Sequence, residues 1–305
     1  MARSTSLKKI IIGTRGSALA LIQTDIVSRA LVSVDSSLTI EVRVIQTHGD
    51  INQKSIPLDT IGKGWFTKEI ENELLDGMID LAVHSLKDMA EEMPNGLMIG
   101  AYLPREDARD VLITKHRESL EKLKRGAVVG TDSSRRQIQM RALRPDVQMK
   151  SLRGNVQKRL ERLLSEPYDA IILATAGLKR LGLVDRITSY FDFNEMTPSP
   201  GQGILAVQAR ESDVALQSIL TSINDPDAAH AARIERSFSR VMGGGCKSPT
   251  GAYAFRDGAE CRLIGMTEGP DGKIMREEMR AKWDASAGLG EKLAKKMLRD
   301  RKRHA

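Results

Sequence analysis

Residues 11–20 read Ile-Ile-Gly-Thr-Arg-Gly-Ser-Ala-Leu-Ala, and this stretch decides the fold class. The apolar segment Lys9–Thr14 predicts a strand, and the helical spacing from Ser17 to about Ser33 predicts a helix after a short turn. Thr39–Gln46 then alternates apolar and polar residues, as a half-buried strand does. Strand, helix and strand in this order favour a mainly parallel sheet with helices on its faces.

The same alternation of predicted strands and helices continues on both sides of Pro104. Further strands are predicted at Leu81–Val83, Leu97–Leu103, Val111–Thr114, Ala127–Thr131, Val147–Ser151, Ala170–Ala174 and Ile204–Arg210. Further helices are predicted at Phe66–Leu75, Ser119–Lys124, Ser134–Leu143 and Val156–Leu164. After Pro226 the pattern changes to a small α+β arrangement. Its predicted elements are the helix Ala228–Val241, the strands Ala252–Phe255, Cys261–Met266 and Lys273–Met279, and the helix Leu289–Leu298.

A faint internal repeat relates two parts of the chain. Ile11-Ile-Gly-Thr-Arg-Gly-Ser resembles Val128-Val-Gly-Thr-Asp-Ser-Ser, and Asp80-Leu-Ala-Val resembles Asp169-Ala-Ile-Ile. The repeat predicts two similar α/β domains that face each other across a cleft. The alternative is the general likeness that all α/β proteins share at this level.

The charge balance favours an anionic partner. Lys+Arg 47 against Asp+Glu 40 give +7, with a pI of about 9.4. Nucleic acid, a membrane surface and a carboxylate or phosphate substrate all stay open on this ground. Hydrophobic residues at 41% and charged residues at 29% are typical of a globular protein.

The location of the protein is predicted from what its sequence lacks. No window approaches the ~18 apolar residues of a membrane helix, and Ile10–Ile12 is too short for the core of a signal peptide. A cytoplasmic protein with no membrane partner is therefore expected. Cys246 and Cys261 are expected to be free thiols in a reducing compartment, and no Cys/His spacing predicts a metal site.

Two turns at predicted strand ends carry candidate site residues. Arg15 and Ser17 follow the first strand at a helix N-terminus, which suits an anion, although Ser17 alone is explained as a helix cap. Lys87 and Asp88 follow the strand Leu81–Val83. They could hold a carboxylate and supply acid/base chemistry, or they could form an ordinary loop ion pair.

Arginines gather at the next two strand ends. Arg135 and Arg136 follow one, and Arg153 and Arg159 follow the other. Guanidinium groups bind carboxylates in a bidentate manner, so the four arginines suit a ligand with several carboxylates. A solvated basic face or a nucleic-acid footprint is the alternative, but aromatic stacking platforms are missing from this region.

Cys246 lies among glycines and beside a lysine. The neighbouring cation favours a reactive thiolate, and a structural cysteine in a tight turn is equally compatible with the spacing.

Taken in order along the chain, these segments resemble the porphobilinogen deaminase (hydroxymethylbilane synthase) family. The likeness runs from Ile11 to Gly251 and weakens after that. The stretches that carry it are Gly13-Thr-Arg-Gly-Ser-Ala-Leu-Ala, Thr47-His-Gly-Asp, Gly62-Lys-Gly-Trp-Phe-Thr-Lys-Glu, His84-Ser-Leu-Lys-Asp, Leu103-Pro-Arg-Glu-Asp-Ala-Arg-Asp, Ser133-Ser-Arg-Arg-Gln, Ser151-Leu-Arg-Gly-Asn-Val-Gln-Lys-Arg, Ala176-Gly-Leu-Lys-Arg-Leu-Gly, Pro200-Gly-Gln-Gly and Gly244-Gly-Cys-Lys-Ser-Pro-Thr-Gly.

The resemblance implies a transferase of tetrapyrrole and haem biosynthesis. Such an enzyme condenses four porphobilinogen molecules head to tail, releases ammonia each time and forms hydroxymethylbilane. The primer is a dipyrromethane cofactor joined to a cysteine by a thioether. The implied fold has two domains like those of periplasmic binding proteins around a cleft, here 1–103 with 203–222 and 104–202, and a small α+β domain, 223–305, with the cysteine. The family is usually monomeric.

The resemblance also implies residue roles, carried over by motif position. Asp88 matches the catalytic aspartate, and Cys246 matches the cysteine that carries the cofactor. The positions implied to bind the cofactor are Asp50, Lys87, Thr131, Ser133, Arg135 and Arg136. The positions implied to bind the substrate are Arg15, Ser17, Arg153, Arg159, Arg180 and Gln202. No metal is implied.

Two other functions remain as hypotheses. A non-catalytic anion-binding protein with two lobes is disfavoured by the missing signal peptide and by the Cys246 loop. A nucleic-acid-binding protein is motivated by the basic pI and would show binding that weakens steeply with salt.

Overall fold

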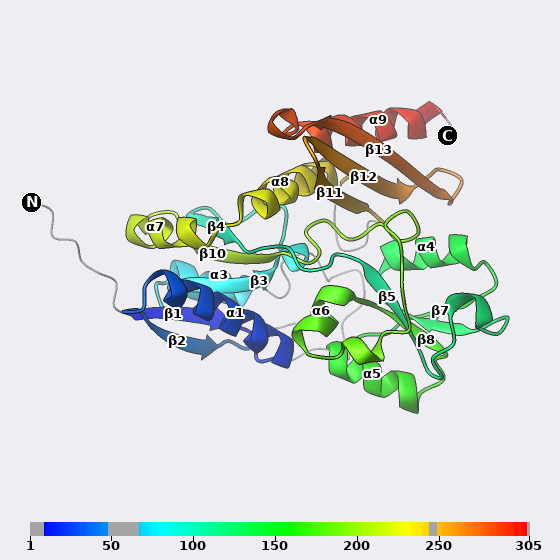
Figure 1. Cartoon of the computed structure of the whole chain (residues 1–305), viewed down its shortest axis with the longest axis horizontal. Coiled ribbons are helices and arrows are strands. Elements are labelled where there is room, and N and C mark those ends of the chain that lie inside the picture. The colour runs from blue at the N-terminus through cyan, green and yellow to red at the C-terminus, as the bar shows by residue number, and fades with distance from the viewer. Residues whose placement is uncertain (1–8, 48–66, 244–248, 304–305) are drawn as a thin grey trace, which may run out of the picture. The chain divides into compact units, whose positions relative to one another are not determined.

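The computed structural model describes residues 9–47, 67–243 and 249–303 (Figure 1). Asp50 and Cys246, predicted to bind and to carry the cofactor, lie outside the described residues. The chain divides into two compact units, Met1–Arg105 with Ile204–Ala229 and Glu106–Gly203 with His230–Ala305. Within the described ranges, no helix combines the length and apolarity that a membrane span requires.

The first unit is built on a five-stranded sheet in the order β2-β1-β3-β10-β4. Its strands are β1 (Lys9–Thr14), β2 (Thr39–Val44), β3 (Leu81–Ser85), β4 (Leu97–Tyr102) and β10 (Leu205–Arg210). Its helices are α1 (Ala18–Val34), α3 (Lys68–Leu75) and α7 (Val214–Ile223). Along β1, Ile10 and Ile12 join a core with α1 and α7, whereas Ile11 faces a second core formed with α3. The period-2 alternation of the strand thus gives the sheet a helical layer on each face.

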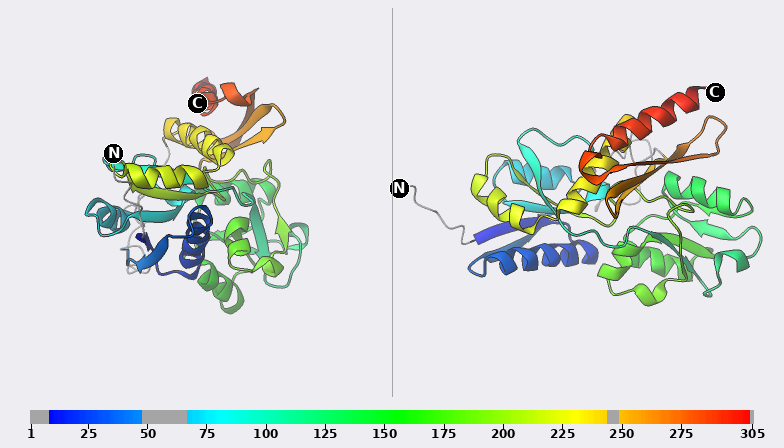
Figure 2. Two further views of the ribbon diagram at one scale, coloured as in Figure 1. Left: turned by 60° about the vertical axis from the view of Figure 1, so that its left-hand side comes forward. Right: turned by 45° about the horizontal axis from the view of Figure 1, so that its top comes forward.

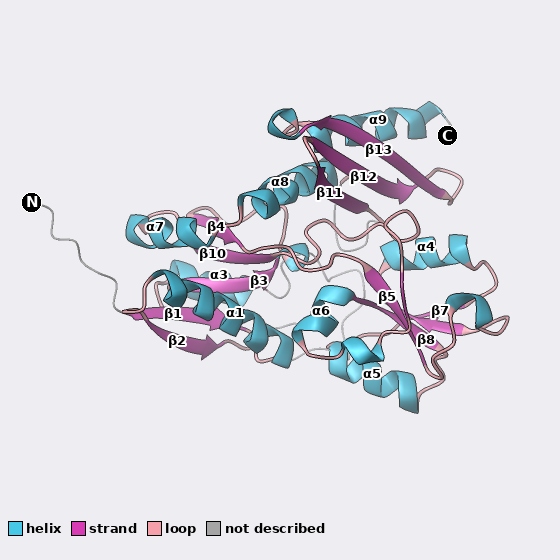
Figure 3. Ribbon diagram, in the orientation of Figure 1, coloured by secondary structure: helices cyan, strands magenta, loops and turns pink. Residues whose placement is uncertain are grey.

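The Glu106–Gly203 part of the second unit repeats this architecture (Figure 3). Its sheet has the order β7-β6-β8-β5-β9. The strands are β5 (Asp110–Thr114), β6 (Val128–Gly130), β7 (Gln148–Lys150), β8 (Ala170–Ala174) and β9 (Ser189–Tyr190), and the helices are α4 (Ser134–Leu143), α5 (Val156–Ser165) and α6 (Thr175–Arg180). Helix α4 shares one core with the sheet, and α5 and α6 share the other.

The two sheets are equivalent strand by strand, which confirms the predicted repeat. In each sheet the two leading pairings are parallel, and one antiparallel strand, β10 or β5, is inserted before the last strand. The repeated aspartates perform the same task. Asp80 Oδ2 accepts from the Ile11 amide at 2.8 Å, and Asp169 Oδ2 accepts from the Val128 amide at 2.8 Å. Each carboxylate therefore ties the residue before β3 or β8 to the neighbouring parallel strand, β1 or β6.

The remainder of the second unit is the predicted α+β arrangement. An antiparallel sheet of β11 (Gly251–Asp257), β12 (Glu260–Glu268) and β13 (Ile274–Lys282) packs on α8 (Pro226–Val241) and α9 (Leu289–Arg303), as Figure 2 shows from two further directions. Gly290 allows α9 to approach α8, because an added Cβ would lie 2.0 Å from the Ile234 carbonyl oxygen. The fold class, two mixed α/β sheets with a small α+β part, is confirmed.

Several local predictions differ from the structure, and the two-residue strand β9 was not predicted. The helix expected over Ser119–Lys124 is only the 3₁₀ turn Leu120–Lys122, because the backbone leaves the helical conformation at Leu123 (ψ 134°) and the segment is too short to sustain an α-helix. Helices α6 and α7 were not predicted. Gly177 makes α6 read as a turn, and α7 lies in a segment for which no element was predicted.

A buried polar chain crosses the core of the first unit. His84 Nε2 on β3 donates to Gln208 Oε1 on β10 at 3.1 Å, and Gln208 Nε2 donates to Glu71 Oε1 on α3 at 3.2 Å. Burial lowers the pKa of His84 to about 4; the hydrogen bond to Gln208 opposes this shift, and the positive charge of Arg15 adds to it. His84 is therefore neutral in the folded protein at physiological pH, and its place in the core is structural.

This burial predicts an acid-side loss of stability. The unfolded chain binds a proton at the ordinary His84 pKa of 6.5 and the folded chain only near 4, so the free energy of unfolding falls as pH drops between these values. His84 accounts for up to about 3 kcal/mol of this fall in the free energy of unfolding. Urea unfolding of wild type and His84→Gln at about pH 7 and 4.5 should show a smaller drop in the variant. Equal drops would contradict the prediction.

Candidate active site

One group of predicted site residues lies at the carboxyl edge of the first sheet. Because β1 and β3 are parallel neighbours, their carboxyl ends meet at one edge. Arg15 follows β1, and Lys87 and Asp88 lie in the 3₁₀ turn Leu86–Asp88 that follows β3. Asp88 is exposed, whereas Arg15 and Lys87 are half-buried. The edge thus presents cations beside an accessible carboxylate.

Ser17 has a structural task at this edge. It is the N-cap of α1, and its Oγ accepts from the Ala20 amide at 3.2 Å. The simpler explanation offered by the sequence, helix capping, therefore accounts for Ser17, and its contact with substrate stays a prediction.

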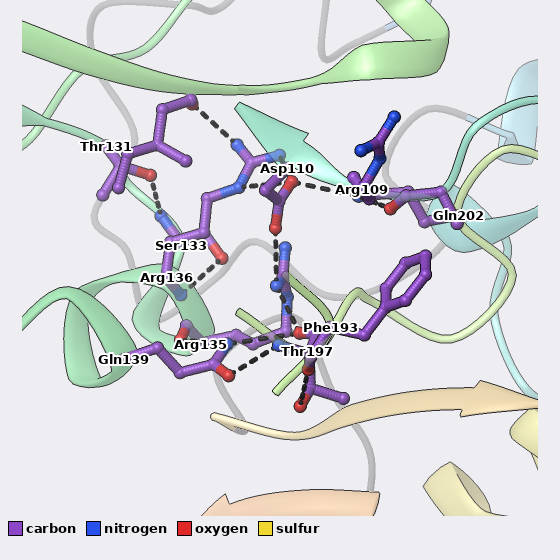
Figure 4. A network of polar contacts seen from close by, with 12 residues as sticks. Arg109, Asp110, Thr131, Ser133, Arg135, Arg136, Gln139, Phe193, Thr197 and Gln202 are labelled. Atoms are coloured by element: carbon purple, nitrogen blue, oxygen red, sulfur yellow. Dashed lines mark hydrogen bonds and ion pairs between the residues drawn. The ribbon is translucent and has the colours of Figure 1, made fainter. Parts of the chain in front are cut away.

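A second group surrounds Asp110 at the start of β5 (Figure 4). Arg135 Nη1 lies 2.8 Å from Asp110 Oδ2, and Arg136 Nη2 lies 2.7 Å from Oδ1. Asp110 is 0% exposed and each arginine 5%. Burial disfavours the charged carboxylate, but the two guanidiniums outweigh it and hold the pKa of Asp110 well below its ordinary value.

Gln202 and the turn after β6 complete this cluster. Gln202 is buried, and its Nε2 donates to the Ala108 carbonyl at 2.7 Å and to Asp110 Oδ1 at 3.0 Å. Thr131 Oγ1 accepts from the Ser133 amide at 3.2 Å, and Ser133 caps α4 by accepting from the Arg136 amide at 3.4 Å. These contacts fix the first turn of α4, from which both arginines project.

The charges of this cluster do not cancel. Among the described residues, two buried guanidiniums face one buried carboxylate here, so this part of the cluster carries an excess of one positive charge in a region that water scarcely reaches. Burial lowers the pKa of Arg135, and the Asp110 charge opposes that shift. An added carboxylate would relieve the imbalance, so the donor set fits an anionic cofactor.

The other predicted arginines lie at the carboxyl edge of the second sheet. Arg153, after β7, donates from Nε to Asp132 Oδ2 at 2.8 Å, and Arg159 on α5 donates to the Gly154 carbonyl at 2.7 Å. Arg180, at the end of α6, donates to the Gly203 carbonyl at 2.7 Å. Burial lowers the pKa of Arg180 to about 10, against the charge of Glu106. Half-buried guanidiniums at a sheet edge suit carboxylate ligands.

Three residues that hold this cluster together were not predicted: Asp110, Gln139 and Thr197. Gln139 is buried on α4, and its amide pairs with the Thr197 backbone, accepting from N at 2.8 Å and donating to O at 3.2 Å. A signal existed for Asp110, because an acidic residue directly before the apolar run Val111–Ile113 must find a cation once buried. Gln139 and Thr197 carry no comparable signal.

Comparison with known families covers nearly the whole chain. Residues 10–218 match the family described as "Porphobilinogen deaminase, dipyromethane cofactor binding domain", and residues 229–299 match "Porphobilinogen deaminase, C-terminal domain". Among solved structures, a YaeC-family lipoprotein from Enterococcus faecalis covers 75% of this chain and 96% of its own at 12% identity and a TM-score of 0.45, too low to support a conclusion.

Individual relatives agree with the family match. A porphobilinogen deaminase of Geobacillus kaustophilus is 45% identical over 275 residues, covering 90% of this chain and 89% of the relative. One of Alkaliphilus metalliredigens is 42% identical over 295 residues, covering 96% and 93%. Identity at this level along both units, together with the arginine-rich sheet edge, shows that the chain belongs to the porphobilinogen deaminase family.

Proposed function

We propose that this enzyme condenses four porphobilinogen molecules head to tail into hydroxymethylbilane, with loss of ammonia at each step. The observation that carries the proposal is the buried excess of positive charge around Asp110 within a chain of this family. The substrate bears two carboxylates in each unit, so the growing product is a polyanion. Carboxylates brought close together repel one another unless cations neutralise them.

A dipyrromethane cofactor fits the residues present. Arg135 and Arg136 would hold its carboxylates, with Lys87, Thr131, Ser133 and Asp50 as further contacts, and Cys246 would carry it through a thioether. When bound, the group supplies a free pyrrole carbon to which the first substrate unit is joined. The fixed turn at Thr131–Ser133 supports this assignment, because a rigid helix start presents both guanidiniums in a defined direction.

Asp88 is proposed as the catalytic carboxylate. Its accessible position would let it stabilise the positive charge that develops on the substrate as ammonia leaves, and take up the proton released when the new bond forms. Substrate carboxylates would be bound by the residues of the two sheet edges. These are Arg15, Ser17, Arg153, Arg159, Arg180 and Gln202.

Further proposals concern the organisation of the protein. We propose three domains, 1–103 with 203–222, 104–202 and 223–305. The separate cores of the two α/β sheets and of the C-terminal sheet support this division. A monomer that works in the cytoplasm, without nucleic acid or membrane as partner, is the expected form. The free and buried Cys261 is compatible with a reducing compartment.

Intact-mass measurement tests the proposal. Purified wild type should carry the mass of a dipyrromethane, and adding porphobilinogen should produce stepwise adducts. Cys246→Ser should lose the adduct because no thiolate remains to form the thioether. Cys261→Ala is the matched control: burial raises the pKa of the Cys261 thiol and leaves it inert, so this variant should keep the adduct.

The mass measurement and a DNA-binding assay at several salt concentrations together separate the alternative functions. A fully active wild type without an adduct would refute the cofactor assignment. Binding of a DNA duplex that weakens steeply with salt, together with no adduct, would favour a nucleic-acid-binding protein.

A further inference from the structure

The segment Thr197-Pro198 is a junction between two parts of the second unit. On one side it meets α4, which carries Arg135. Thr197 O accepts from Arg135 Nη1 at 2.6 Å, and Gln139 brackets the same backbone unit through its N and O (Figure 4). The position of the Arg135 guanidinium therefore depends on where Thr197 lies.

On its other side the junction meets the C-terminal sheet. The Ala252 amide on β11 donates to the Pro198 carbonyl at 3.0 Å. Gly251 packs directly against the segment, because an added Cβ would lie 2.9 Å from Thr197 O. Phe193 and Tyr253 stack with ring centroids 3.9 Å apart. The strand β11, which follows the proposed attachment residue Cys246 in sequence, thus packs against the same segment that accepts the Arg135 hydrogen bond.

Arg276 on β13 is the side chain that ties the two sides together. Its Nε donates to Thr197 Oγ1 at 3.1 Å, and its Nη2 donates to Gln139 Oε1 at 3.0 Å and to the Glu195 carbonyl at 3.3 Å. Among the described residues it forms no ion pair, so its charge is directed entirely at neutral acceptors of the junction. Burial lowers the pKa of Arg276, and the charge of Asp192 opposes that shift only in part.

We propose that Arg276 is a positioning residue. It holds Thr197 and Gln139 in place and thereby fixes the position of the C-terminal sheet relative to the Arg135 guanidinium. The inference rests on the proposed function. In that proposal Cys246 carries the dipyrromethane and Arg135 neutralises its carboxylates, so the two must be aligned. A guanidinium is suited to this task, because its planar fork reaches several acceptors at once with fixed geometry, as a lysine cannot.

The test compares apoprotein, produced without porphobilinogen, with holoprotein. Melting temperature is measured for both forms of wild type, Arg276→Lys, Arg276→Leu and Arg280→Leu. The stabilisation given by the adduct, holo minus apo, should shrink in both Arg276 variants. The rate at which apoprotein acquires the adduct should fall about tenfold or more, because small displacements of a binding group cost rate steeply. Arg280, exposed on the same strand and paired with Glu278 at 2.8 Å, should change neither quantity.

A second arm distinguishes positioning from a general loss of stability. Arg135→Lys alone should slow adduct formation, and adding Arg276→Lys to it should slow it little further, because both act through one guanidinium. Additive effects, or equal losses of melting temperature in apo- and holoprotein with unchanged adduct formation, would overturn the inference. Wild type without any adduct would instead refute the proposed function and is a separate result.

Discussion

Asp88→Ala is expected to reduce turnover about 10²- to 10⁴-fold, the range usual for removal of a positioned acid/base group. Substrate binding should persist, because the guanidiniums that recognise carboxylates remain in place. Stability should persist as well: among the residues that the structure describes, none donates to the exposed Asp88 carboxylate. Steady-state kinetics combined with a thermal melt checks both expectations.

The control is an exposed aspartate away from the sheet edge, Asp25→Ala, which removes only the ion pair with Arg29 on α1. Asp88→Asn adds a further distinction, since it keeps the size of the side chain and abolishes its charge. Near-normal turnover in either Asp88 variant would remove this residue from the mechanism. A large loss of melting temperature would instead point to a structural role.

Asp110→Asn is expected to destabilise the protein strongly. The variant leaves two buried guanidiniums without a counter-charge, and breaking such a buried pair costs about 3–5 kcal/mol. In a protein of this size that corresponds to a fall in melting temperature of about 10 °C. The same variant should assemble the adduct poorly, because the direction of both guanidiniums is set by the missing charge.

The pH dependence of this effect follows from the sign of the shift. The pKa of Asp110 lies below its ordinary value of 3.8. The ionised Asp110 therefore contributes fully to the free energy of unfolding of wild type above that pH, and this contribution is lost only as pH falls further. The difference in free energy of unfolding between wild type and Asp110→Asn should therefore be constant from neutral pH down to about 4 and become smaller below that pH. Asp146→Asn, which removes a pair with Arg144 that is only partly buried, is the control and should cost much less. An equal cost in both variants would contradict the prediction.

The sequence predicted most elements because their signals were local. Ser134–Leu143 and Ala170–Ala174 have the predicted bounds, and Asp80 and Asp169 identified the repeat that the hydrogen bonds to Ile11 and Val128 confirm. The 3₁₀ turn at Leu120–Lys122 was overestimated because its apolar spacing resembles a helix, while the backbone already leaves the helical conformation at Leu123. Such short elements are decided by their neighbours rather than by their own residues.

The candidate site was predicted in its residue types and only partly in its contacts. Guanidiniums at strand ends could be expected, and the acidic residue before Val111–Ile113 signalled a buried carboxylate that needs a cation. Which guanidiniums this carboxylate pairs with could not be expected. Asp110 reaches Arg135 and Arg136 because β5 is inserted beside β8, a pairing that no local pattern encodes. The same holds for Thr197 and Arg276, which meet only after the C-terminal sheet has packed.

The insertion of β10 between β3 and β4 has a consequence for biosynthesis. The ribosome completes β3 and β4 early, but the strand that separates them emerges only after all of 106–203 has been made. Until then both strands have an unpaired edge, open to pairing with other nascent chains. A translation product that stops before Leu205 therefore also leaves the sheet of the first unit incomplete, because it lacks β10, the strand that joins β3 to β4.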